Sequence, residues 1–204
     1  MSQDDSREEA VIDHFGLEQY SCANRSNKYE PDAKATINEK VYTFELKSKP
    51  ELKPDGKRKT NVSTARGFNP KKAKEWKKKV SGGFIFSEYE GAQFNGVFNA
   101  HYALTYEQLH PIIKEKVINP FNHGRPATKK SVGYIGMKEY ERWFKPLALA
   151  TGNHALRLKL EHTLEAGASL NDPKFPWKFI KENGTLIKNR KDLEAFIENH
   201  IQGD

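Results

Sequence analysis

Cysteine is almost absent from this sequence of 204 residues, and long apolar runs are absent altogether. The single cysteine, Cys22, excludes a disulfide within the chain and a metal site built from several thiolates. No run approaches the ~18 consecutive apolar residues of a membrane-spanning helix. The first residues are acidic and lack the basic and apolar regions of a signal peptide. We therefore expect a soluble cytoplasmic protein that does not associate with membranes.

Positive charge is in excess but is unevenly distributed along the chain. Lys and Arg number 34 and Asp and Glu 27, which gives a net charge of +7. Residues 1–20 form an acidic arm with a net charge of −5, whereas residues 47–79 carry +10. A run of lysines is more often a solvated face than a binding surface. This run is long, however, and it contains Arg66 and Asn69, which can contact bases as well as phosphates. We expect residues 47–79 to line a DNA-binding cleft and the acidic arm to stay away from the phosphates.

The distribution of apolar and turn-forming residues predicts strands flanked by helices. This pattern is typical of an α/β (α+β) fold with a mixed β-sheet. We expect one domain over residues 1–204, with a mostly helical insertion at about 105–166. Helices are expected from Ser6, from Asn69-Pro70, from Thr105, over 137–149 and 154–167, and from Asp192. Strands are expected over Ala33–Ile37, Val41–Lys47, 83–91, 92–104, Trp177–Ile180 and Thr185–Ile187.

Two acidic residues and a lysine are predicted to meet on the first pair of strands. Side chains alternate between the two faces of a strand, so Glu45 and Lys47 share one face. If Asn38-Glu39 forms a two-residue turn, Asp32 lies opposite Glu45 on the neighbouring strand. A third loop residue would move Asp32 to the other face unless a bulge restored the register.

This trio suits the hydrolysis of a phosphodiester. Asp32 and Glu45 offer the hard oxygen ligands that Mg²⁺ prefers, and the metal activates water and offsets phosphate charge. Lys47 can orient or deprotonate the attacking water and can stabilise the pentacovalent phosphorus. The arrangement is that of PD-(D/E)xK nucleases. Such a triplet also arises by chance in a chain with 30% charged residues, where it would be an exposed hairpin. The adjacent basic stretch favours the nuclease.

Three sequence blocks, in the same order, resemble the PvuII-type restriction endonucleases of the PD-(D/E)xK superfamily. They are Asp32-Ala33 with Tyr42–Ser48, Ser63-Thr64 with Asn69-Pro70, and Asn171–Pro176 with Lys178–Ile180 and Asn183–Thr185. The resemblance implies a restriction-endonuclease-like core in a homodimer that cuts both strands of a short palindromic DNA site. It also implies Mg²⁺ as the cofactor, with Mn²⁺ able to substitute, and a companion DNA methyltransferase in a bacterial or archaeal cell.

The resemblance also assigns roles to individual residues. Asp32, Glu45 and Lys47 take the catalytic positions, and the carbonyl of Leu46 takes a metal contact. The positions of DNA-contacting residues fall on Ser63, Thr64, Arg66, Gly67, Asn69, Asn171, Asp172 and Lys174. Arg66-Gly67 stands where the family has consecutive histidines, and Asp172 where it has the second asparagine of a pair. Arg pairs with guanine and Asp accepts from cytosine, so we expect a G/C-containing site.

Two other functions remain open on the sequence alone. A structure-selective repair nuclease of the same superfamily would share the catalytic trio but prefer branched or damaged DNA. A DNA-binding protein that keeps the fold without cutting would show salt-dependent binding and no nicking. Cleavage that is sensitive to base methylation, or dependent on it, is compatible with each nuclease hypothesis. Trp76 occupies the place of a family tyrosine, and its role is left open between a stacked and a core side chain.

Overall fold

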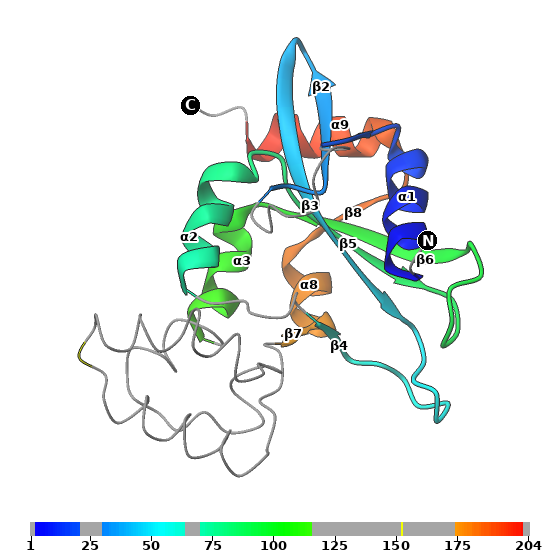
Figure 1. Cartoon of the computed structure of the whole chain (residues 1–204). Helices are drawn as coiled ribbons and strands as arrows, with labels where there is room; N and C mark the ends of the chain where they lie inside the picture. The colour runs from blue at the N-terminus through cyan, green and yellow to red at the C-terminus, as the bar shows by residue number, and fades with distance from the viewer. Residues whose placement is uncertain (1–2, 21–29, 64–69, 116–151, 153–173, 202–204) are drawn as a thin grey trace. The chain divides into compact units, whose positions relative to one another are not determined.

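The computed structural model describes five parts of the chain, namely residues 3–20, 30–63, 70–115, 152 and 174–201 (Figure 1). The chain divides into two compact units. The first, here called the sheet unit, comprises Met1–Val62, Glu75–Leu109 and Pro176–Asp204. The second comprises Ser63–Lys74 and His110–Phe175. The helices expected over 137–149 and 154–167 lie outside the described residues.

A six-stranded mixed sheet is the centre of the sheet unit, with strand order β1-β2-β3-β5-β6-β8. Strands β3 and β5 are parallel, and the other neighbouring pairs are antiparallel. This confirms the expected mixed sheet flanked by helices. The strands are β1 (Glu18–Gln19), β2 (Ala33–Ile37), β3 (Lys40–Pro50), β5 (Gly83–Tyr89), β6 (Phe98–Leu104) and β8 (Thr185–Ile187). Two further strands, β4 (Asn61–Ser63) and β7 (Lys174–Pro176), include the residues where the chain passes between the units.

The turn between β2 and β3 fixes the register of the whole hairpin. Asn38 and Glu39 both have positive φ angles, 49° and 65°. Positive φ at both central residues is the requirement of a type I′ turn, whose twist matches that of the flanking strands. The pairing runs from Ile37 opposite Lys40 to Ala33 opposite Phe44. The predicted two-residue turn and the predicted register are therefore confirmed.

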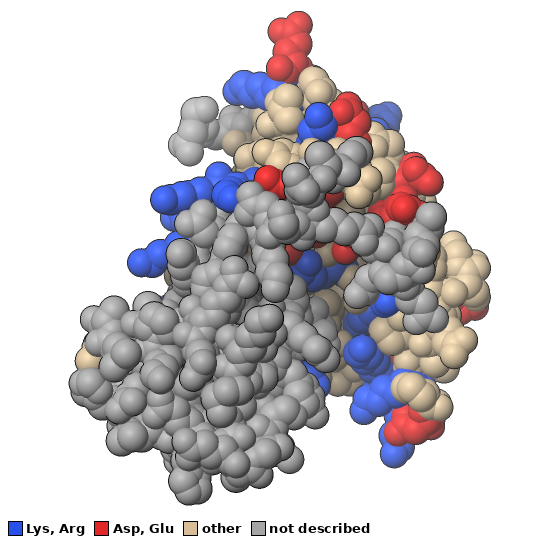
Figure 2. Space-filling model, in the orientation of Figure 1, with Lys and Arg blue, Asp and Glu red and all other residues tan. Residues whose placement is uncertain are grey.

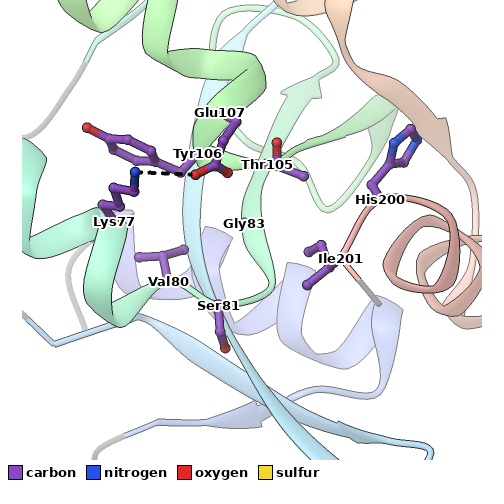
Figure 3. A pocket seen from close by; sticks show the side chains of 9 residues that line it. All are labelled: Lys77, Val80, Ser81, Gly83, Thr105, Tyr106, Glu107, His200 and Ile201. Atoms are coloured by element: carbon purple, nitrogen blue, oxygen red, sulfur yellow. Dashed lines mark ion pairs between the residues drawn. The ribbon is translucent and has the colours of Figure 1, made fainter. Parts of the chain in front are cut away.

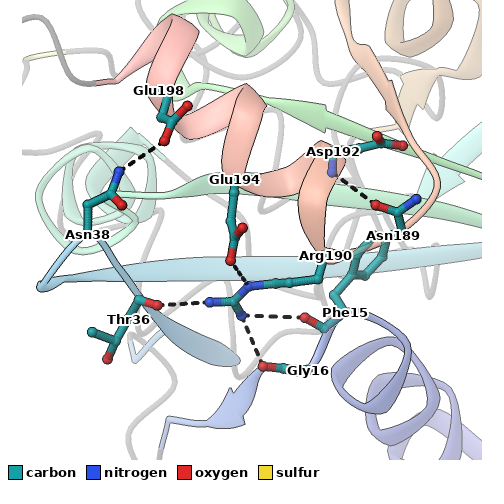
Figure 4. A network of polar contacts seen from close by, with 9 residues as sticks. All are labelled: Phe15, Gly16, Thr36, Asn38, Asn189, Arg190, Asp192, Glu194 and Glu198. Carbon is teal, nitrogen blue, oxygen red and sulfur yellow. Dashed lines mark hydrogen bonds and ion pairs between the residues drawn. The ribbon is translucent and has the colours of Figure 1, made fainter.

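Helices α1 (Gln3–Phe15) and α9 (Arg190–His200) cover one face of the sheet. Arg190 ties these elements together, since its guanidinium donates to the carbonyls of Gly16 and Thr36 at 3.0 and 2.8 Å (Figure 4). Its Nε also donates to Glu194 at 2.8 Å. The apolar core beneath consists of Val11, Phe15, Leu17, Ala33, Ala35, Ile37, Tyr42, Phe44, Leu46, Ile85, Ala103, Ile187, Leu193, Phe196 and Ile197.

The opposite face packs against aromatic side chains from α2 (Pro70–Lys79) and α8 (Trp177–Asn183). Trp76 is 2% exposed and meets Phe84 edge-on, with ring centroids 5.1 Å apart. Trp177 meets Tyr102 in the same way at 5.5 Å. Trp76 is therefore a core side chain.

Helix α3 (Tyr106–Ile113) begins as the sequence predicts. The hydroxyl of Thr105 accepts from the backbone N–H of Gln108 at 3.1 Å. The Gln108 side chain accepts from the Thr105 N–H at 2.8 Å. This reciprocal pair is a capping box, which satisfies two N–H groups that a helix start leaves unpaired. None of the helices among the described residues is long and apolar enough to cross a membrane.

Three local predictions are wrong. The segment Trp177–Ile180, expected as a strand, begins α8. Trp177 and Ile180 are buried while Lys178 is exposed, and a spacing of three places the two apolar side chains on one helix face. The helix expected from Ser6 already begins at Gln3. No strand was expected before Ala33, but β1 lies at Glu18–Gln19.

A buried histidine on the α1–α9 face makes stability depend on pH. Nδ1 of His101 lies 2.7 Å from the Ser87 hydroxyl, and its ring stacks on His14 at 4.8 Å. Burial, with a smaller contribution from His14, lowers the pKa of His101 from 6.5 to about 4. The unfolded chain therefore binds more protons between these pH values, so stability is retained above pH 6.5 and lost as the pH falls toward 4.

We expect this group to lower the free energy of unfolding by about 3 kcal/mol between pH 7 and pH 4. Urea denaturation of the wild type and of His101→Gln at several pH values measures the effect. The variant lacks the titrating ring, so its stability should change less over this range. Identical pH dependence in the two proteins would contradict the assignment.

Candidate active site

The β2–β3 hairpin brings Asp32 to the side of β3. The backbone N–H of Asp32 donates to the Phe44 carbonyl at 3.0 Å and extends the ladder by one residue. Its carboxylate accepts from the N–H of Leu46 at 2.8 Å. Glu45 lies at the next position of the register and is 4% exposed. Glu45 is therefore held on a regular strand, and Asp32, directly before β2, is held by its hydrogen bonds to β3.

Lys47 joins the two carboxylates. Its Nζ lies 2.6 Å from Oε1 of Glu45 and 3.7 Å from Oδ2 of Asp32. It also donates to the Leu46 carbonyl at 3.0 Å. Burial of the ammonium lowers the pKa of Lys47, but the attraction of Glu45 and Asp32 outweighs it and leaves the pKa above its ordinary value. Glu8 of the acidic arm adds a smaller attraction, so this arm is not electrostatically separate from the site.

The oxygen atoms at this point are of the type that a hard divalent cation prefers. The candidate donors are the carboxylates of Asp32 and Glu45 and the carbonyl of Leu46, all of which Lys47 contacts. Among the described residues, no group of three or more His, Cys, Asp or Glu side chains could hold a metal ion. Two carboxylates are nevertheless sufficient for Mg²⁺, which keeps several of its waters in protein sites. The donor set is all oxygen, so it suits Mg²⁺ or Mn²⁺ rather than a thiolate-binding metal.

Aromatic side chains form the wall beside the trio. The register places Phe84 opposite Glu45 and Phe86 opposite Lys47. Nζ of Lys47 lies 6.0 Å from the ring centroid of Trp76. An apolar wall of this kind lowers the local dielectric constant and strengthens every charge interaction at the site. The wall was not predicted from the sequence, although the alternation of Phe84 and Phe86 could have indicated it.

No family model and no curated protein matches this chain. Its function is therefore inferred from the site itself.

A second buried ion pair, which sequence reasoning missed, lies on the same face of the sheet. Lys49 follows Lys47 by two residues and is 0% exposed. Its ammonium pairs with the carboxylate of Glu88, which is directly opposite on β5 and 5% exposed. It also donates to the Lys59 carbonyl at 3.0 Å and lies 4.7 Å from the ring centroid of Trp177. Burial lowers the pKa of Lys49, and Glu88 opposes this change.

Of the residues expected to contact DNA, two lie among the described residues, on the strands β4 and β7, which pair in a small two-stranded sheet. Ser63 ends β4 and Lys174 begins β7, and both belong to the second unit. The others lie outside the described residues, namely Thr64, Arg66, Gly67, Asn69, Asn171 and Asp172. Their predicted role in base recognition stays a prediction.

A separate pocket of about 470 Å³ lies between α2, α3 and the end of α9 (Figure 3). Lys77 and Glu107 approach to 4.0 Å beside it. Gly83, in its lining, has a φ of +91°, and an added Cβ would lie 2.4 Å from the Leu104 carbonyl oxygen. A side chain is therefore excluded at this start of β5. The pocket does not include any residue of the trio.

Proposed function

We propose that this chain is a Mg²⁺-dependent endodeoxyribonuclease of the restriction type, built on a PD-(D/E)xK core. One observation carries the proposal. Asp32, directly before β2, and Glu45, on β3, converge on the ammonium of Lys47 at 3.7 and 2.6 Å. The 14% exposure of the Lys47 side chain keeps this charge cluster largely away from water but open to a substrate.

Each member of the trio has a chemical task in this proposal. Asp32 and Glu45, with the Leu46 carbonyl, would hold the metal ion. When bound, the ion lowers the pKa of a coordinated water and offsets negative charge on the phosphodiester. Lys47 donates hydrogen bonds, and from its position between the carboxylates it can orient the attacking water or a phosphate oxygen. Its charge also opposes the negative charge that develops on the phosphorane oxygens.

The proposed substrate is double-stranded DNA. The basic stretch over residues 47–79 supplies the charge for phosphate binding. Restriction-type cleavage of both strands requires two active sites, so we propose a homodimer that recognises a short palindromic G/C-containing site. We also propose a companion DNA methyltransferase. The effect of base methylation on cleavage is tested by comparing methylated and unmethylated DNA.

Plasmid cleavage tests the proposed function. We expect the wild type to linearise DNA with Mg²⁺ or Mn²⁺ and not with EDTA. Glu45→Ala should lower the rate at least about 100-fold, because it removes a metal-binding oxygen at the reacting centre. Glu9→Ala removes an exposed acid of α1 and should cut as the wild type does.

The outcomes of this experiment separate the alternatives. Cleavage by Glu45→Ala at the wild-type rate would show that Glu45 is not part of the active site. DNA binding without any metal-dependent nicking would identify a non-cutting binding protein. A preference for branched over intact duplex DNA would identify a repair nuclease. Run-off sequencing of DNA cut from methylated and unmethylated substrates then gives the site.

A further inference from the structure

A small basic pocket lies on the sheet unit, beyond the candidate active site. It has a volume of about 210 Å³ and is lined by Arg58, Lys59, Thr60, Trp177, Lys178 and Lys181. This lining, all of it within the described residues, includes four basic side chains and no acidic one. The positive charge comes from two parts of the sequence, because the two lysines of α8 lie far along the chain from the basic stretch. The fold therefore brings together basic residues that lie far apart in the sequence.

The pocket contacts β3, the strand that carries Glu45 and Lys47. The backbone N–H of Trp177 donates to the Thr60 carbonyl at 2.8 Å and joins α8 to the loop after β3. The Trp177 ring covers the ammonium of Lys49, and that ammonium binds the carbonyl of Lys59. Both walls of the pocket are thus tied to one buried side chain of β3.

The spacing between Lys47 and Lys49, the side chain that the pocket walls contact, suits a substrate that is a polyanion. Lys49 and Lys47 are two residues apart on the same face of β3, which is about 7 Å along the strand. DNA carries one phosphate per about 3.4 Å of helix axis on each strand. A DNA strand at the trio can therefore place a phosphate in the pocket a few nucleotides away.

The surface around the pocket is mainly basic but includes the acidic side chains of Asp55 and Glu182. Figure 2 shows basic side chains gathered over the loop that follows β3, at the lower right of the view. Lys178 lies 3.6 Å from Glu182, but the two side chains are 83% and 58% exposed. An ion pair as exposed as this contributes little and can be exchanged for a phosphate contact.

We propose that this pocket binds a backbone phosphate of duplex DNA and so positions the strand whose scissile bond lies at the trio. Arg58 can bind a phosphate through two parallel N–H groups, and the lysines contribute point charges. The buried Trp177 excludes water from one side, which strengthens these interactions. The position of the phosphate relative to the cut rests on the proposed function, whereas its binding does not.

The test is DNA binding in EDTA, where the chain cannot cut. Fluorescence anisotropy with a labelled 25-base-pair duplex gives the binding constant at several salt concentrations. Lys178→Ala/Lys181→Ala should lower the slope of log K against log salt by about 1, because the contact with one phosphate is lost. At 0.1 M salt we expect affinity to fall at least about tenfold.

A matched control isolates the pocket from overall charge. Lys188→Ala/Lys191→Ala removes the same charge from exposed residues just before and within α9, on the other side of the sheet. It should leave the slope unchanged. Equal effects of the two double variants, no effect of the first, or no DNA binding by the wild type would each overturn the proposal. A reduced slope in Lys178→Ala/Lys181→Ala, together with a wild type that never cuts, would support the pocket and reject the nuclease. Normal cleavage by the wild type, together with an unchanged slope in this variant, would reject the pocket alone.

Discussion

Lys47→Met is expected to lower the rate of DNA cleavage by about 10³-fold and to leave divalent metal binding intact or stronger. The ammonium now pairs with Glu45 at 2.6 Å and with Asp32 at 3.7 Å. It therefore competes for the same oxygens that a metal ion would bind. Methionine has a similar length and no charge, so the carboxylates are left to the metal. The loss of rate has the size expected when a group acting on the transition state is removed.

Two measurements separate these effects. Titration of Mn²⁺ by electron paramagnetic resonance gives the metal affinity, and plasmid cleavage gives the rate. Asp32→Asn is the matched control, because it keeps Lys47 and removes a carboxylate, and it should lose both metal affinity and cleavage. Cleavage by Lys47→Met at the wild-type rate would show that Lys47 has no part in the chemistry. A loss of metal binding in Lys47→Met would show that Lys47 instead supports the fold of the site.

The hairpin that carries the trio was predictable because its determinants are local. The two-residue turn at Asn38-Glu39 sets the register, and alternation along β3 places Glu45 and Lys47 together. A stretch of sixteen residues from Asp32 to Lys47 contains all the necessary information.

The partner of Lys49 was not predictable from such a pattern. Glu88 stands opposite only because β3 and β5 are parallel neighbours, and α2 lies between them in sequence. Pairing over this distance depends on the whole sheet. The basic pocket was missed for a related reason, because Trp177–Ile180 was assigned to a strand. Its alternation of two aromatic residues with Lys178 and Ile180 resembles a strand over four positions, whereas burial at Trp177 and Ile180 follows a helix.

The two faces of the sheet carry different side chains, apolar on one and partly charged on the other. This difference indicates which face holds the candidate active site. The face under α1 and α9 buries the apolar side chains Phe44 and Leu46 of β3. The opposite face of the same strand carries Glu45, Lys47 and Lys49 under aromatic cover. Buried charge is costly, and replacing an ion pair by apolar residues is often neutral or stabilising. The retention of charge on one face alone is consistent with a functional surface.

Lys49→Met is expected to lower the free energy of unfolding by about 3–5 kcal/mol. The substitution leaves the carboxylate of Glu88, which is 5% exposed, without the ammonium that now faces it. It also leaves the Lys59 carbonyl without its hydrogen-bond donor. An uncompensated buried charge is one of the few changes that destabilise a domain this strongly. Urea denaturation at pH 7 measures the loss.

The double variant Lys49→Met/Glu88→Leu distinguishes the charge from the packing. Because both charges are removed, most of the lost stability should return. Lys34→Met is the control for an exposed pair, since Lys34 and Glu18 are 37% and 66% exposed at 3.2 Å, and it should cost less than about 1 kcal/mol. A double variant no more stable than Lys49→Met would mean that Lys49 acts through Trp177 and the Lys59 carbonyl. In that case the variant should also weaken DNA binding at the basic pocket, because those contacts hold its walls to β3.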